Sequence, residues 1–202
     1  MMGCSNPHPH GQLWALSAVP TIPSTELASL ARYASTETPP SGAPKGPNGR
    51  PCLLCEYAHF ELDVPKTEGR IVVQNDHWIA LVPWWANWPF EMLRTLSLTH
   101  MWQVLISLLA VLPHNRHVPS IYHLTLAEKS SFAQILSKIT IQYDNLFHCS
   151  FPYSMGIHQR PIPPPENLNV ETSQCDDDIA HLHLHFYPPL LRSASVRKFS
   201  VG

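Results

Sequence analysis

The stretch AHLHLHFY, residues 180–187, alternates between apolar and polar side chains with a period of two. This period is typical of a β-strand, in which successive side chains point to opposite faces of a sheet. His181, His183 and His185 would share one face, and the apolar residues between them would share the other. The stretch therefore predicts a strand whose apolar face packs on the core and whose other face carries imidazoles.

The histidine face of this strand needs a chemical reason. Neutral imidazoles two positions apart on a strand can bind one metal ion. His158, in the stretch SMGIH, is a candidate further ligand, and a carboxylate such as Glu26 would complete the shell. The alternative is a solvated strand face that binds nothing. The alternation of three histidines favours the metal site over that alternative.

A second histidine pair lies near the start of the chain, in GCSNPHPHGQ, residues 3–12. The prolines around His8 and His10 restrict the backbone, and the glycine allows it further conformations. Together they would pre-organise the two imidazoles. A histidine that is oriented by a hydrogen bond can attack phosphorus as a covalent nucleophile. It can equally bind a metal, and a structural loop with two exposed histidines is a third interpretation.

The five cysteines are an odd number without a secretory signal before them, which indicates reduced thiols and an intracellular, cytoplasmic protein. Cys52 and Cys55 have CxxC spacing, but no second CxxC follows. A metal or redox role would need partners that the sequence does not identify. We therefore predict two cysteines on a short amphipathic helix over residues 52–62.

Composition excludes several functional classes. The 202 residues are 44% hydrophobic, enough for one substantial core or two small ones. A net charge of -2 is unlike the basic face of a nucleic-acid-binding protein. The most apolar run, residues 101–112, is shorter than the roughly 20 residues that span a bilayer. We expect neither a nucleic-acid partner nor a membrane-spanning helix.

Two helices carry start signals. The first is expected to open at Pro23 and run to about Tyr33, with Ser24 or Thr25 as the N-cap. The second follows a capping box formed by Thr125 and Glu128. Its apolar stripe has helical spacing and comprises Phe132, Ile135, Leu136, Ile139 and Tyr143.

Residues 70–75 and 77–83 predict two strands joined at Asn75-Asp76. Residues 35–51 and 160–178 are rich in proline and predict a linker and a long surface loop.

Four stretches occur in a recognisable order: GCSNPHPHGQ, PWWANWPFE, YDNLFHCSFPYSMGIH and HLHFYPPLLRSASVRKF. Together they resemble the galactose-1-phosphate uridylyltransferase family of the histidine-triad superfamily. The resemblance implies an α+β fold of two related halves, each a twisted, mainly antiparallel sheet with helices. Residues 1–34 would end the first half, residues 35–51 would be a linker, and residues 52–202 would form most of the second half.

The resemblance also implies an activity. The family moves UMP between glucose-1-phosphate and galactose-1-phosphate by double displacement, so UDP-glucose and UDP-galactose are the expected nucleotide partners. His10 would be the nucleophile. Ser5 and Gln12 would contact the phosphate groups, and Lys198 would reach substrate phosphate across the interface of a homodimer.

Two metal sites follow from the same resemblance. His8 would be a zinc ligand that braces the nucleophile loop. A second, structural site for iron or zinc would take a carboxylate and three imidazoles: Glu26, His158, His183 and His185. His181 is then an extra histidine, and no role in the family's zinc site transfers to Cys52 and Cys55.

The sequence departs from the family pattern in one segment and at both ends. PFEML would run almost directly into LPHNRHV, but residues 94–110 intervene as an apparent insertion. The family's uridine pocket would lie upstream of the motif, and the family continues past residue 202. We therefore expect the chain as written to fold poorly and to turn over little substrate.

Two other functions stay open at this point. One is a metal-binding remnant without catalysis. The other is a histidine-triad nucleotide hydrolase, which is disfavoured because Gln12 stands where those hydrolases usually carry another histidine.

Overall fold

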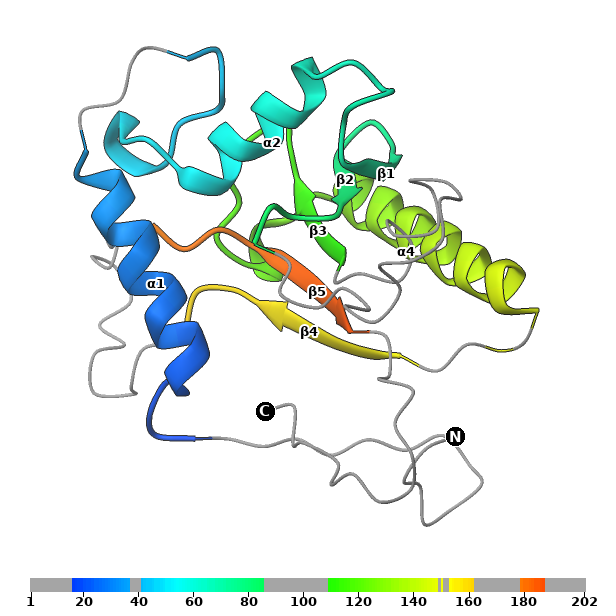
Figure 1. Ribbon diagram of the computed structural model, residues 1–202. Coiled ribbons are helices and arrows are strands. Elements are labelled where there is room, and N and C mark those ends of the chain that lie inside the picture. Colours follow the sequence, from blue (N-terminus) through cyan, green and yellow to red (C-terminus); the bar gives the residue numbers. More distant parts are fainter. Residues whose placement is uncertain are drawn as a thin grey trace, which may run out of the picture.

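The computed structural model describes residues 16–36, 41–85, 109–148, 150, 153–161 and 179–187. The helices in these ranges are α1 (Thr21–Ala34), α2 (Leu53–Asp63) and α4 (Leu126–Phe147), with short 3-10 turns η1 (Pro47–Gly49) and η2 (Ile121–His123). The strands are β1 (Ile71–Gln74), β2 (Trp78–Leu81), β3 (Leu109–Pro113), β4 (Ser154–His158) and β5 (His183–Tyr187). They form one antiparallel sheet in the order β1-β2-β3-β5-β4, so the predicted α+β class is confirmed (Figure 1).

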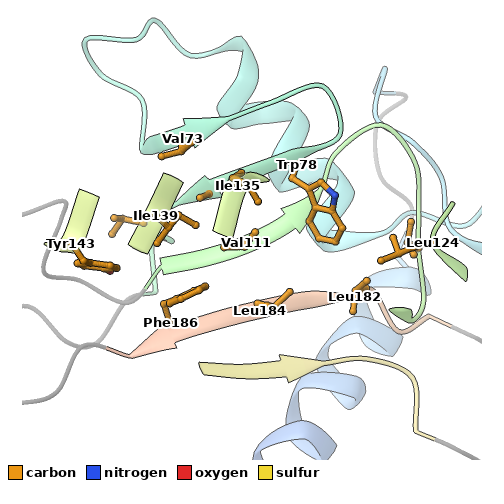
Figure 2. Packing of buried hydrophobic residues seen from close by; sticks show 13 residues of the cluster. Val73, Trp78, Val111, Leu124, Ile135, Ile139, Tyr143, Leu182, Leu184 and Phe186 are labelled. Atoms are coloured by element: carbon orange, nitrogen blue, oxygen red, sulfur yellow. The ribbon is translucent and has the colours of Figure 1, made fainter. Parts of the chain in front are cut away.

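One face of the sheet packs against α4, which contacts β1 and β2. Figure 2 shows Trp78 and Val111 of the sheet facing the Ile135, Ile139 and Tyr143 side of this helix. The apolar side chains of β5 and of the residue before it join the same core: Leu182, Leu184 and Phe186. The predicted apolar face of residues 180–187 is therefore confirmed, although the strand itself begins at His183.

The other face of the sheet carries different kinds of side chain on different strands. On β2 and β3 it carries Ile79, Leu81, Ala110 and Leu112, which pack with α2 and with Leu30 of α1. On β5 the same face carries histidine, because His185 pairs directly with Ala110. His181, His183 and His185 are only 1%, 7% and 6% exposed. The solvated strand face is therefore wrong, because α1 and α2 cover these imidazoles.

The start of α1 corrects one prediction. The helix begins at Thr21 rather than Pro23, its N-cap is Pro20, and no side chain in the described part of the chain caps it. The Thr25 hydroxyl instead donates to the carbonyl of Thr21 at 2.9 Å. Pro23 is tolerated because it lies in the first turn, where backbone N–H groups have no partner inside the helix.

The hairpin of β1 and β2 follows the prediction. Both strands are shorter than expected, and Asn75 forms the turn between them. Its Oδ1 accepts hydrogen bonds from the backbone N–H groups of His77 at 3.2 Å and Trp78 at 2.9 Å. This local side-chain-to-backbone bonding is what favours asparagine in turns.

The capping box at α4 is confirmed and is part of a larger network. The Glu128 N–H donates to Thr125 Oγ1 at 3.2 Å, and the Thr125 N–H donates to Glu128 Oε2 at 2.8 Å. Arg116 also donates to both Glu128 oxygens, at 2.7 and 2.8 Å. This bidentate bond from Arg116 is the largest cause that lowers the pKa of Glu128, to about 2.

We expect Glu128→Gln to destabilise the chain by roughly 2–3 kcal/mol at pH 7, because each unit of pKa shift corresponds to about 1.4 kcal/mol. The folded-state pKa lies below the unfolded-state value, so this stabilisation is present above about pH 4.5 and is lost as the pH falls towards about 2. Urea denaturation curves across this pH range measure it. The exposed Glu68→Gln is the matched control. Equal pH dependence in wild type and Glu128→Gln would contradict the assignment.

The apparent insertion, residues 94–110, lies outside the described residues except for its last two. Leu109 and Ala110 belong to β3, in the middle of the sheet. Within the described ranges, every helix is too short or too polar to cross a bilayer.

Candidate metal centres

The Glu26 cluster, formed by Glu26, His158, His183 and His185, lies where α1 meets the edge of the sheet. Glu26 projects from α1, His158 ends β4, and the other two histidines belong to β5. His158 pairs with His183 across the two strands. The structure therefore brings together all four residues of the second predicted metal site, with one donor atom from each within 4.8 Å of the others.

The carboxylate of Glu26 is the centre of this cluster. Its Oε2 lies 2.6 Å from His158 Nδ1 and 3.8 Å from His183 Nε2, and its Oε1 lies 3.9 Å from His185 Nε2. Burial raises the pKa of Glu26, but the hydrogen bond with His158 and the nearby imidazoles more than offset it. The pKa of Glu26 is therefore below its ordinary value, and the carboxylate is ionised at neutral pH.

The two histidines of β5 are neutral at pH 7. Burial lowers the pKa of His183 to about 4 and that of His185 to about 3. His183 Nδ1 lies 2.7 Å from the backbone carbonyl of His181. An N–H on that nitrogen satisfies the carbonyl and leaves a lone pair on Nε2, which faces Glu26. Such an outer hydrogen bond is usual for a metal-binding histidine. One carboxylate and three imidazoles suit zinc or iron.

The second group of donors corrects the interpretation of the CxxC pair. Cys52 and Cys55 meet His117 and His181, again with donor atoms within 4.8 Å of one another. We name this set the Cys52 cluster. A hydrogen bond from the Cys55 thiol lowers the pKa of Cys52. Cys52 precedes α2 rather than lying within it, and His181 is no longer an extra histidine.

His117 was not predicted from the sequence as a member of any site. It lies in the loop between β3 and η2, far along the chain from both cysteines and from His181. The available signals were indirect. The CxxC pair had no identified partners, and the alternating strand contained one histidine, His181, without an assigned role.

The other predicted site residues lie outside the described residues. These are the nucleophile, the phosphate contacts and the first zinc ligand: His10, Ser5, Gln12, Lys198 and His8.

Comparison with models of known protein families identifies the family of this chain. Residues 27–202 match the model of the galactose-1-phosphate uridyl transferase C-terminal domain, and residues 1–20 match the N-terminal domain of the same family. The chain belongs to the galactose-1-phosphate uridylyltransferase family. The predicted resemblance is therefore confirmed.

Curated relatives match along the whole chain. The galactose-1-phosphate uridylyltransferase of Cryptococcus neoformans var. neoformans is 44% identical over 203 residues, which cover 100% of this chain and 43% of the relative. The enzyme of that name from Rattus norvegicus is 42% identical, again over 100% of this chain and 43% of its own length. The chain thus spans less than half the length of these relatives.

Solved structures agree with the fold of the uridylyltransferase family. A structure described as uridylyltransferase superposes with a TM-score of 0.61 at 25% identity, over 92% of this chain and 44% of that one. An ADP-glucose phosphorylase from Arabidopsis thaliana gives a TM-score of 0.55 at 17% identity, over 88% of this chain and 42% of that one. The second likeness supports the fold alone.

Proposed function

We propose that this chain serves in a uridylyltransferase of galactose metabolism. The reaction converts UDP-glucose and galactose-1-phosphate into glucose-1-phosphate and UDP-galactose. The observation that supports it is the match of both family domains in sequence order, with the HPHGQ motif inside the N-terminal match at residues 1–20.

The proposed chemistry has two halves. An imidazole nitrogen of His10 attacks the α-phosphorus of UDP-glucose, and the bond to the oxygen of the leaving glucose-1-phosphate breaks. A phosphate oxygen of galactose-1-phosphate then attacks the uridylyl-histidine, which forms UDP-galactose and frees His10. Ser5 and Gln12 donate hydrogen bonds to phosphoryl oxygens, where negative charge grows during transfer. In a homodimer, Lys198 reaches the phosphate of the partner subunit's substrate.

The described residues include the helix that follows the nucleophile motif in the sequence, and this helix is anchored to the sheet. Helix α1 begins at Thr21, shortly after the motif, and it is fixed to the sheet by Glu26 and by the burial of Leu30. A zinc or iron ion held by the Glu26 cluster would cross-link α1 to β4 and β5. The cluster would thereby anchor α1, which follows the motif in the sequence, and its role is structural. His8 would bind zinc within the loop itself. We assign the protein to the cytoplasm because its cysteine usage indicates reduced thiols.

The covalent intermediate gives the sharpest test. The purified chain is incubated with UDP-glucose without acceptor and analysed by intact and peptide mass spectrometry. Although we expect little turnover from the chain as written, a uridylyl adduct on His10 needs only the first half of the reaction and accumulates without acceptor, so we expect to detect one that galactose-1-phosphate removes. His10→Asn should abolish the adduct. His59→Asn, which changes a half-exposed histidine on α2, should leave it unchanged.

The outcomes separate the two classes of function. An adduct that is lost only in His10→Asn supports the transferase. A chain that contains metal but forms no adduct and binds no UDP-glucose would overturn the proposal and favour the metal-binding remnant. Release of free UMP at a rate that galactose-1-phosphate does not change would favour a nucleotide hydrolase.

A further inference from the structure

The geometry points to a second structural metal site: Cys52, Cys55, His117 and His181 bind one zinc ion in a closed, tetrahedral arrangement. This inference is independent of uridylyl transfer, because none of the four residues belongs to the proposed nucleophile loop. It concerns a different set of ligands from the Glu26 cluster.

The distances between donor atoms match the edges of a zinc tetrahedron. Bonds of about 2.3 Å to sulfur and about 2.05 Å to nitrogen separate two nitrogens by about 3.4 Å, and a nitrogen from a sulfur by about 3.6 Å. The Nδ1 atoms of His117 and His181 are 3.2 Å apart. Cys52 Sγ and Cys55 Sγ lie 3.7 and 3.6 Å from His181 Nδ1. All three distances fall within a few tenths of an ångström of the expected edges.

The surroundings hold the ligands in place without a metal. Cys52 precedes α2 and Cys55 lies in its first turn, so the helix itself sets the CxxC spacing. The Leu182 N–H donates to the carbonyl of Val118 at 2.6 Å. This backbone bond ties the residue after His181 to the residue after His117. The two histidine-bearing segments are therefore joined beside the two thiols.

The outer partner of His181 favours metal binding. Its Nε2 lies 3.4 Å from the backbone carbonyl of Pro113, within reach of an N–H bond. A proton on Nε2 leaves the lone pair of Nδ1 directed towards the sulfur atoms and His117. This is the arrangement that zinc-binding histidines show. Because Cys52, Cys55 and His181 are buried, the site has no open position for a substrate, and its role is structural.

The two clusters share a segment of backbone. The side chain of His181 belongs to the Cys52 cluster, while its carbonyl lies 2.7 Å from Nδ1 of His183 in the Glu26 cluster. Zinc at the first site would fix the carbonyl that orients His183 at the second. Metal in one site is therefore expected to raise the affinity of the other.

The competing interpretation is a metal-free cluster of thiols and imidazoles held by hydrogen bonds. It differs from a zinc site in the state of the sulfur atoms, because only a bound metal converts both thiols into thiolate ligands. A measurement that detects metal–thiolate bonds therefore decides between them. The Glu26 cluster contains no cysteine and cannot give that signal.

The experiment uses the full chain with Co²⁺ in place of the native metal. We expect an absorption band for charge transfer from thiolate to cobalt in the wild type. Cys55→Ser and His117→Asn should each weaken or abolish it, and zinc content should fall by about one equivalent per chain. Glu26→Gln removes a ligand of the other cluster and should keep the band. His59→Asn is the control for the histidine substitution.

A measurement on the unmodified protein covers the case in which the variants do not fold. The wild-type protein, loaded with zinc, is alkylated with and without chelator, and the labelled cysteines are mapped by peptide mass spectrometry. Protection of Cys52 and Cys55 that chelator removes supports the site. Equal labelling under both conditions, or a cobalt-loaded wild type without the thiolate band, would overturn it.

Discussion

Removal of bound metal by a strong chelator is expected to destabilise the chain more than any single substitution. A ligand that binds only the folded state at about 1,000 times its Kd adds about 4 kcal/mol, so two such sites add about 8 kcal/mol. That sum is comparable to the whole stability of many domains. Urea denaturation with and without chelator measures the change in the free energy of unfolding.

The physical reason is that the sheet buries aliphatic side chains on some strands and imidazoles on another. Where β2 and β3 bury aliphatic side chains against α2, β5 buries imidazoles. Without metal, these polar groups contribute little apolar burial to hold α1, β4 and β5 together. Hydrogen exchange should therefore show that chelation exposes α1 and the edge strand β4 before α4. An unchanged unfolding midpoint after complete metal removal would contradict this expectation.

Trp78→Ala is the substitution with the largest expected cost, about 3–5 kcal/mol. Trp78 is 0% exposed and belongs to the core on the face of the sheet that packs against α4 (Figure 2). Its ring lies 4.5 Å from that of Phe132. Its Nε1–H also donates to the backbone carbonyl of Glu128 at 2.9 Å. The substitution therefore leaves a cavity and removes a buried hydrogen bond to the start of α4. Chemical denaturation measures the loss.

Trp84→Ala is the matched control for this cavity. Trp84 is 66% exposed, and its described contacts are the guanidinium of Arg70 over the ring and a backbone bond to the Tyr57 hydroxyl. An exposed cation–π contact is worth about 0.5–1 kcal/mol. If the two tryptophan variants lose similar stability, Trp78 does not anchor the α4 core as described.

The fold was predictable where the signal is local. The alternation of residues 180–187, the Asn75 turn and the Thr125–Glu128 capping box each arise from neighbouring residues, and the structure confirms all three. The start of α1 was misplaced because Thr25 looks like an N-cap. Its hydroxyl bonds instead to the preceding turn of the helix, an alternative that propensity does not distinguish.

The two candidate metal sites were predictable only in part. The ligands of the Glu26 cluster came from family resemblance combined with the period of β5, and the structure brings them together. The Cys52 cluster depends on bringing His117 together with residues at the start of α2 and just before β5, which only tertiary structure specifies. Residues far apart in a single sequence leave no mark of such a contact. The nearest sign in the sequence was that the alternating stretch contains one histidine, His181, that the predicted second metal site does not use.

The most direct test of the paired metal sites is anomalous diffraction from crystals of the full chain, measured at the zinc and iron absorption edges. Our account predicts two peaks. One lies among Cys52, Cys55, His117 and His181, at zinc bond lengths of about 2.0–2.3 Å. The other lies among Glu26, His158, His183 and His185. Density for both donor sets with no peak between the ligands, from protein purified without chelator, would contradict the account.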